Sequence, residues 1–103
     1  MPHKRFVIVT ILFSKERDGR WTAECAEFGT ATFGDTLEEA KENILEALDL
    51  HLNTLEETGE FDRFVREHNI KVHTARPKKV VRVEAPIDRD IFFQPYVHEL
   101  CEA

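Results

Sequence analysis

The first quarter of the chain has a hydrophobic pattern typical of paired β-strands. Residues 6–13 form an apolar run interrupted only by Thr10, which is long enough for a central strand and too short for a typical helix. Asp18 and Gly19 then form a pair suited to a tight turn, so the pattern predicts a hairpin. Its second strand is expected to place Trp21, Ala23 and Cys25 on one face, toward the core.

A junction between a strand and a helix follows. Residues 30–33 have the composition of a short strand, and Gly34 ends it. Thr36 and Glu39 have the spacing of a capping box, in which the threonine hydroxyl accepts a backbone N–H and the glutamate reaches back. We interpret Gly34, Asp35, Thr36 and Glu39 as a structural helix cap. An anion site is disfavoured, because acids occupy the first turn and no nucleotide-binding glycine motif is present.

The pattern after this cap predicts a long amphipathic helix over residues 36–58. Apolar residues recur at three- and four-residue spacing, and Gly59 is a natural stop. A second, shorter helix is predicted over residues 60–68, with Asn69 as its stop. The apolar stripe of the long helix comprises Leu37, Ala40, Ile44, Leu48, His51 and Leu55.

The last part of the chain is less regular. Residues 80–85 predict a strand ended by Pro86. We expect residues 1–86 to form one domain and residues 87–103 an apolar C-terminal tail, docked on the domain or on an oligomer partner. Within this tail, Pro95 argues against a helix or a central strand.

Together these elements predict an α+β fold in the order β-β-β-α-α-β. An antiparallel three-stranded meander is followed by a long helix, a short helix and a further strand. The sheet has a second face that the helix does not cover, and a domain of this size often buries such a face against another copy of itself. We therefore expect a homodimer or a higher homo-oligomer.

Composition places the chain among small globular proteins. Its 103 residues suffice for one domain, and hydrophobic residues make up 42% against 33% charged. Nothing approaches the roughly 20 apolar residues that span a bilayer. Without an export signal we expect a cytoplasmic protein that does not enter membranes, with its two cysteines reduced.

The acidity of the chain is concentrated in one segment. The formal net charge is −6, but residues 35–60 alone carry nine acids against Lys41, a local charge of −8. Such a surface disfavours contact with a phosphate backbone and suits a basic partner. The candidate partner-binding residues on the long helix are Glu38, Glu42, Glu46 and Asp49. The simpler alternative is a solvated helix face.

The residues form no recognisable catalytic or metal-binding pattern, so we expect no enzyme activity, no metal and no cofactor. The first strand carries no acid, although Glu24 and Asp35 could approach each other. Histidine and cysteine residues lack the spacing of metal ligands, and Cys25 is interpreted as a core residue rather than a nucleophile. We interpret a basic cluster as charges that keep an edge strand from pairing with another chain, rather than as a nucleic-acid site. The cluster comprises Arg76, Lys78, Lys79 and Arg82.

Over about residues 5–58 the chain has a hairpin with Gly19 and Trp21, a bend at residues 24–28 and a helix start at residues 34–40. In these features it resembles the HicB antitoxin family. The family has a Gly-aromatic hairpin, an E-C-P-E-L-like bend and a G-D-T-x-E-E-A helix start. Ala26 stands where the family usually has proline. The matching residues are Gly19 with Trp21, then residues 24–28, then Gly34, Asp35, Thr36, Glu38, Glu39 and Ala40.

The resemblance implies a partial RNase H-like fold without the nuclease acids, which binds a small basic HicA-type toxin and blocks its access to mRNA. Many members add a helix-turn-helix or ribbon-helix-helix domain, but residues 60–103 contain neither pattern and give no basis for expecting DNA binding. An acidic helix suits a basic toxin. The alternative is a stand-alone oligomeric scaffold or regulatory domain without a toxin partner.

Overall fold

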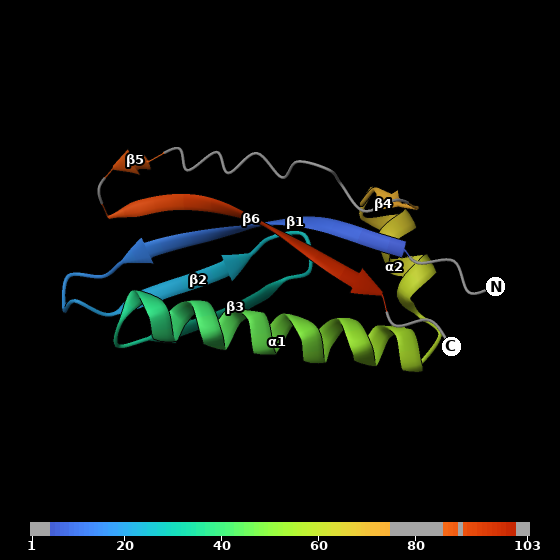
Figure 1. Cartoon of the computed structure of the whole chain (residues 1–103), viewed down its shortest axis with the longest axis horizontal. Coiled ribbons are helices and arrows are strands. Elements are labelled where there is room, and N and C mark those ends of the chain that lie inside the picture. Colours follow the sequence, from blue (N-terminus) through green and yellow to red (C-terminus); the bar gives the residue numbers. More distant parts are fainter. Residues whose placement is uncertain (1–4, 75–85, 89, 101–103) are drawn as a thin grey trace.

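An antiparallel sheet with a long helix across one face forms the protein in the computed structural model (Figure 1). The structure describes residues 5–74, 86–88 and 90–100. The predicted α+β class and the order of its sheet and helices are confirmed. Within the described residues the elements are β1 (Arg5–Lys15), β2 (Trp21–Cys25), β3 (Thr30–Gly34), α1 (Leu37–Glu57), α2 (Phe61–Glu67), β4 (Val72–His73), β5 (Pro86–Asp88) and β6 (Ile91–Leu100).

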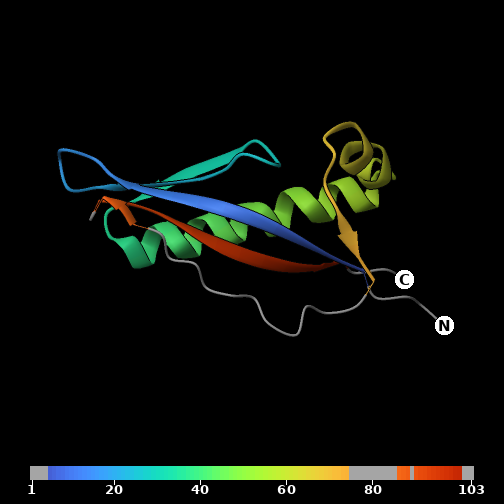
Figure 2. The same cartoon turned by 90° about the horizontal axis from the view of Figure 1, so that it is seen from above.

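The strand order is β3-β2-β1-β6-β5, and the two-residue β4 also pairs with β1. All of these pairs are antiparallel. Strand β1 is therefore central, which explains its long apolar run. Seen from above, α1 covers one face of the sheet and α2 lies at one end, beside β4 (Figure 2).

The C-terminal tail contributes a central strand to this sheet. Strand β6 pairs with β1 from Arg5↔Leu100 to Ser14↔Ile91, so the expectation that Pro95 excludes a central strand is wrong. The reason lies in the register. Pro95 pairs with Thr10, whose N–H points away from β6 and donates to the Glu27 carboxylate at 2.9 Å. Thr10 and Pro95 are thus a non-hydrogen-bonded pair, and the missing proline N–H falls on the side away from β1.

The turns follow the chemistry of their residues. Gly19 has φ +90° in the β1–β2 loop. At the end of α1, Gly59 has φ +74°, its N–H donates to the Glu56 carbonyl, and the next N–H, of Glu60, donates to the Leu55 carbonyl at 2.9 Å. These two hydrogen bonds form a Schellman motif, which provides donors for carbonyls that have no partner within the helix. Asn69 (φ +53°) ends α2 in the same way.

The core lies between α1 and the sheet. Alternate residues of β1 point toward the helix, which gives four buried side chains at two-residue spacing. The helix contributes residues at three- and four-residue spacing to the same cluster. The core comprises Val7, Val9, Ile11, Phe13, Ala23, Cys25, Phe28, Ala40, Ile44, Leu48, Leu52, Leu55, Phe61, Val65 and Leu100.

Some predictions fall outside the described residues. These are the strand over residues 80–85, the basic cluster between Arg76 and Arg82, and Cys101. Across the described parts of the chain, no helix combines the length and the apolar character needed to cross a membrane.

Candidate functional site

The junction that starts α1 is a helix cap. The Thr36 side-chain oxygen accepts the Glu39 N–H at 3.1 Å, and Thr36 has the extended backbone (φ −126°, ψ 164°) of an N-cap residue. The Glu39 carboxylate reaches back to the N–H of Asp35 at 3.4 Å, one residue earlier than a standard capping box. These groups are engaged with one another, so the junction stabilises the helix rather than presenting a binding pocket.

Gly34 is required by close packing against the helix. A Cβ built at Gly34 would lie 2.5 Å from the backbone nitrogen of Ala40, nearer than real contacts allow. The absence of a side chain therefore lets the first turn of α1 approach the end of β3. This fixes the angle at which the acidic helix leaves the sheet.

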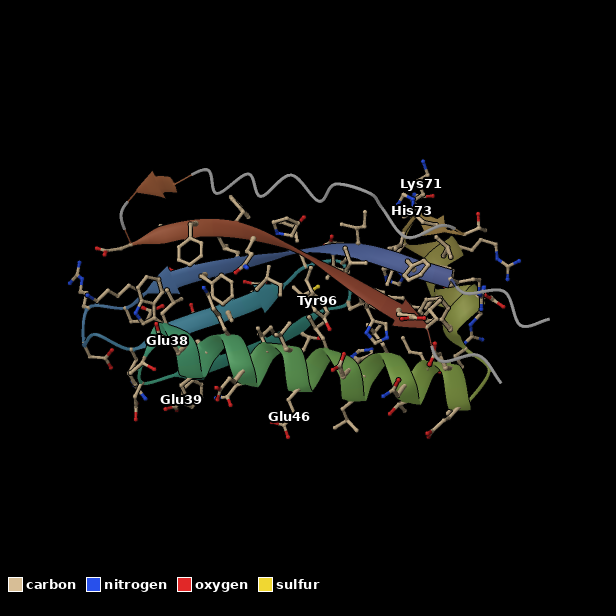
Figure 3. The ribbon with its side chains drawn as sticks, viewed as in Figure 1. Glu38, Glu39, Glu46, Lys71, His73 and Tyr96 are labelled. Atoms are coloured by element: carbon tan, nitrogen blue, oxygen red, sulfur yellow. The ribbon has the colours of Figure 1, made fainter. Side chains whose placement is uncertain are left out.

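The predicted acidic residues lie on two adjacent stripes along α1. Glu38, Glu42 and Asp49 are spaced four and seven residues apart and share the flank next to β6. Glu46 lies seven residues after Glu39 and four after Glu42, on the adjacent stripe. Figure 3 shows Glu39 and Glu46 along the lower side of the helix, with Glu38 above them. Glu38, Glu39, Glu42 and Glu46 are exposed. The structure therefore separates the acids into two stripes.

Asp49 differs from the other acids because it anchors α1 to β6. The Tyr96 hydroxyl donates to its Oδ1 at 3.3 Å, and the Nδ1 of His98 lies 3.1 Å from the same oxygen. A carboxylate only accepts, so the His98 Nδ1 carries the donated proton. Burial, and then the charge of Asp49 and its hydrogen bond, raise the pKa of Tyr96. Spacing along the chain could not pair either residue with Asp49, since both lie nearly 50 residues away and in the tail.

Beside this cluster, a small cavity opens between α1 and β6. Its volume is about 80 Å³. Small-molecule sites typically measure roughly 300–1,000 Å³, so this cavity does not fit a cofactor. The Lys41 ammonium lies 6.0 Å from the ring centre of Phe13 and 5.9 Å from that of Phe92, near its apolar wall. The lining residues are Ile11, Phe13, Lys41, Leu45, Gln94, Pro95 and Tyr96.

The groups considered for chemistry are dispersed. Among the described residues, no three or more His, Cys, Asp or Glu side chains are placed to hold a metal ion. Glu24 lies on the exposed face of β2, away from the core. Cys25 is fully buried, and this burial raises the pKa of its thiol. A thiol with a raised pKa stays protonated near neutral pH, which is opposite to what a nucleophile needs.

Comparison with known proteins now places this arrangement in a family. Residues 9–81 match the profile of a family of unknown function, DUF7387. The chain belongs to this family. It is also 42% identical over 53 residues to UPF0150 protein ssr1765 of Synechocystis sp., an alignment that covers 50% of this chain and 67% of that relative. No solved structure matches the chain.

In this DUF7387 member, the matched residues run from the middle of β1 through the hairpin, α1, α2 and β4. They include the helix cap and all the exposed acids of α1.

Proposed function

We propose that this protein is a non-enzymatic, HicB-like antitoxin of the cytoplasm that binds and neutralises a small basic HicA-type toxin, an mRNA interferase. Two observations support the proposal. The relative belongs to UPF0150, a group of HicB-like proteins. The hairpin and helix-cap residues that resemble that family also occupy structural positions in this fold.

The observation that carries the proposal is the unneutralised charge of α1. Glu38, Glu42 and Glu46 are exposed and form no ion pair with any described residue. Closely spaced like charges on a helix repel one another by a few tenths of a kcal/mol per pair. A cationic partner relieves this repulsion, speeds association and suppresses binding of acidic proteins.

The proposal predicts that a basic protein is encoded beside this chain's gene, and the test uses that protein as the partner. Calorimetric titration should show binding that weakens as salt is raised, because exposed charges are screened. Replacing Glu38, Glu42 and Glu46 by lysine should weaken binding at least about tenfold. This is the loss of affinity expected when several charge pairs at the edge of an interface become repulsive. Co-expression of the unaltered chain should also restore growth that the basic protein inhibits.

A matched control is Glu16→Lys, which makes the same charge change in the exposed β1–β2 loop. It should leave the affinity within about twofold, a difference under 0.5 kcal/mol. Absence of a basic neighbour that binds, or a complex indifferent to salt and to the three reversals, would contradict the proposal.

One observation favours the alternative of an oligomeric scaffold. The sheet face opposite α1 carries a partly buried apolar patch, in which Leu12 pairs with Phe93 and Ile8 with Val97. If this patch joins two copies, Phe93→Lys should lower the mass in solution measured by light scattering. An unchanged mass would exclude the patch as the organiser. Deleting residues 87–103 is unsuitable for this purpose, because it removes β6 from the sheet.

A further inference from the structure

We propose that the outer edge of β3 is a strand-addition site, which binds an extended segment of a partner protein rich in basic side chains. The inference rests on the proposed function for its natural partner, because it names the surface through which a basic protein would be held. Strand addition obtains affinity from main-chain hydrogen bonds and specificity from alternate side chains.

The first observation is a row of backbone groups on β3 with which no described strand pairs. Strand β3 is the last strand in the order β3-β2-β1-β6-β5 and pairs with β2 on one side only. The Asn43 side chain on α1 donates to the Phe33 carbonyl at 2.9 Å, so the backbone polar groups of Phe33 face away from β2. Because orientation repeats every two residues, the N–H and C=O of Ala31 face the same way. No described strand pairs with them.

The second observation is that this edge lacks the usual protection. Natural edge strands carry charged side chains, prolines or bulges that block pairing with another chain. Strand β3 reads TATFG, without a charge or a proline, and its pairing with β2 runs without a bulge from Trp21↔Gly34 to Cys25↔Thr30. The Phe33 carbonyl is bonded to Asn43, so the Phe33 N–H and the N–H and C=O of Ala31 are the groups left for a further strand.

The third observation is that exposed apolar groups border this edge on both sides. Phe33 is 60% exposed on the sheet face opposite α1, and Leu50 is 70% exposed on the helix. Leu50 lies seven residues after Asn43, which places it on the flank of α1 that reaches β3. An open depression of about 390 Å³ also extends from Phe33 over β2 and β3. Side chains of an added strand that alternate between the two sides would meet an apolar group on each.

Charge selects the kind of partner. Glu39 lies four residues before Asn43 and Glu46 three residues after it, so both acids neighbour the side chain that reaches β3. A second copy pairing through β3 would bring two acidic helices together and be repelled. A strand with lysine or arginine at alternate positions would instead bring its positive charges to these acids. The occupant is therefore a basic extended segment rather than another copy of this chain.

The test uses two peptides and the full chain labelled with nitrogen-15. One seven-residue peptide alternates valine and lysine, and its match alternates valine and glutamate. We expect the lysine peptide to shift the amide resonances of Ala31 and Phe33 and to slow their hydrogen exchange. The glutamate peptide should do neither. No binding of the lysine peptide, shifts centred on another element, or equal binding of both peptides would overturn the inference.

A variant tests the backbone contact directly. Ala31→Pro removes only an N–H that faces away from β2, so β3 can remain in the sheet. It should weaken lysine-peptide binding about tenfold, as loss of a hydrogen bond and a clash predict. Ala31→Val keeps the N–H and should bind within about twofold. Equal affinity of the proline variant, with an unchanged circular dichroism spectrum, would overturn the inference.

The same variants separate this inference from the proposed function. If the basic toxin binds the unaltered chain and Ala31→Pro equally well, the edge site is refuted and the antitoxin function stands. If the lysine peptide binds the edge but the toxin does not bind at all, the site stands and the antitoxin function fails.

Discussion

Asp49 and His98 are 49 positions apart in the chain, yet the Asp49 Oδ1 lies 3.1 Å from the His98 Nδ1. The histidine side chain is only 7% exposed, whereas the aspartate is 49% exposed. The contact therefore joins the surface of α1 to a buried position on β6. An acid that sequence reasoning assigned to partner binding also holds the last strand against the helix.

Loss of this carboxylate should destabilise the fold. Asp49→Ala removes the acceptor for both His98 and Tyr96, and leaves the histidine Nδ1–H buried without a partner. We expect the free energy of unfolding to fall by about 1–3 kcal/mol, measured by urea denaturation. Glu42→Ala, an exposed acid on the same flank, should change it by less than about 0.5 kcal/mol. Equal effects of the two variants would show that the Asp49 contacts contribute nothing.

Stability should decline in alkaline solution because of Cys25. Burial raises the pKa of its thiol above the usual value of 9.0. The unfolded chain therefore loses this proton at a lower pH than the folded chain. The contribution of the protonated thiol is fully present below pH 9.0 and is lost as pH rises through the folded pKa. Urea titrations between neutral pH and pH 10.5 or so should show the fall.

The Cys25→Ala variant is the control for this dependence on pH. It will be less stable at every pH because the side chain is smaller, but its stability should fall less steeply in alkaline solution. Tyr96→Phe should also reduce the slope, at higher pH, since the pKa of Tyr96 is raised above 10.0. Parallel curves for all three proteins would contradict both assignments.

Gly34→Ala should be strongly destabilising. The new Cβ would lie 2.5 Å from the Ala40 nitrogen and 2.9 Å from the Glu39 carbonyl carbon, and backbone atoms cannot move aside cheaply. We expect a loss of about 2–3 kcal/mol, the upper range for overpacking, in thermal or urea unfolding.

The matched comparison is Gly59→Ala. Gly59 has no atom within 4 Å of a built Cβ, so only its left-handed backbone (φ +74°) opposes the substitution. The cost there should be about 1 kcal/mol. If the two glycine variants lose the same stability, contact with α1 is not what Gly34 provides.

Thr36→Ala should remove the N-cap of α1. The hydroxyl accepts the Glu39 N–H, and its loss should cost about 1 kcal/mol. Thr36→Ser keeps an oxygen in the same place and should restore most of this stability. Circular dichroism during urea unfolding measures both variants, and a serine variant as unstable as alanine would argue against the capping role.

The local elements were predictable because their causes lie within a few residues. A continuous apolar run predicted the first strand of the hairpin and two-residue alternation the second. Three- and four-residue spacing predicted α1, which the structure places at Leu37–Glu57. The ends of the helices could also be predicted from glycine and asparagine, since only residues tolerant of a positive φ suit those positions.

The role of the tail was not predictable from composition. Proline at position 95 argues against a strand when taken alone, because it cannot donate to a ladder. Proline is tolerated here because the register pairs Pro95 with Thr10, whose own N–H faces β2, so that no hydrogen bond from position 95 to β1 is needed. A register between segments 85 residues apart depends on the whole packed sheet.

The positions of the strands and helices, the cap of α1 and the concentration of negative charge all follow from neighbours along the chain. Which acids remain exposed, the bonds of Asp49 to β6, and the place of β3 at the edge of the sheet follow from the packed fold. Those properties depend on which distant backbone and side-chain groups meet in space, and packing of the whole core selects them.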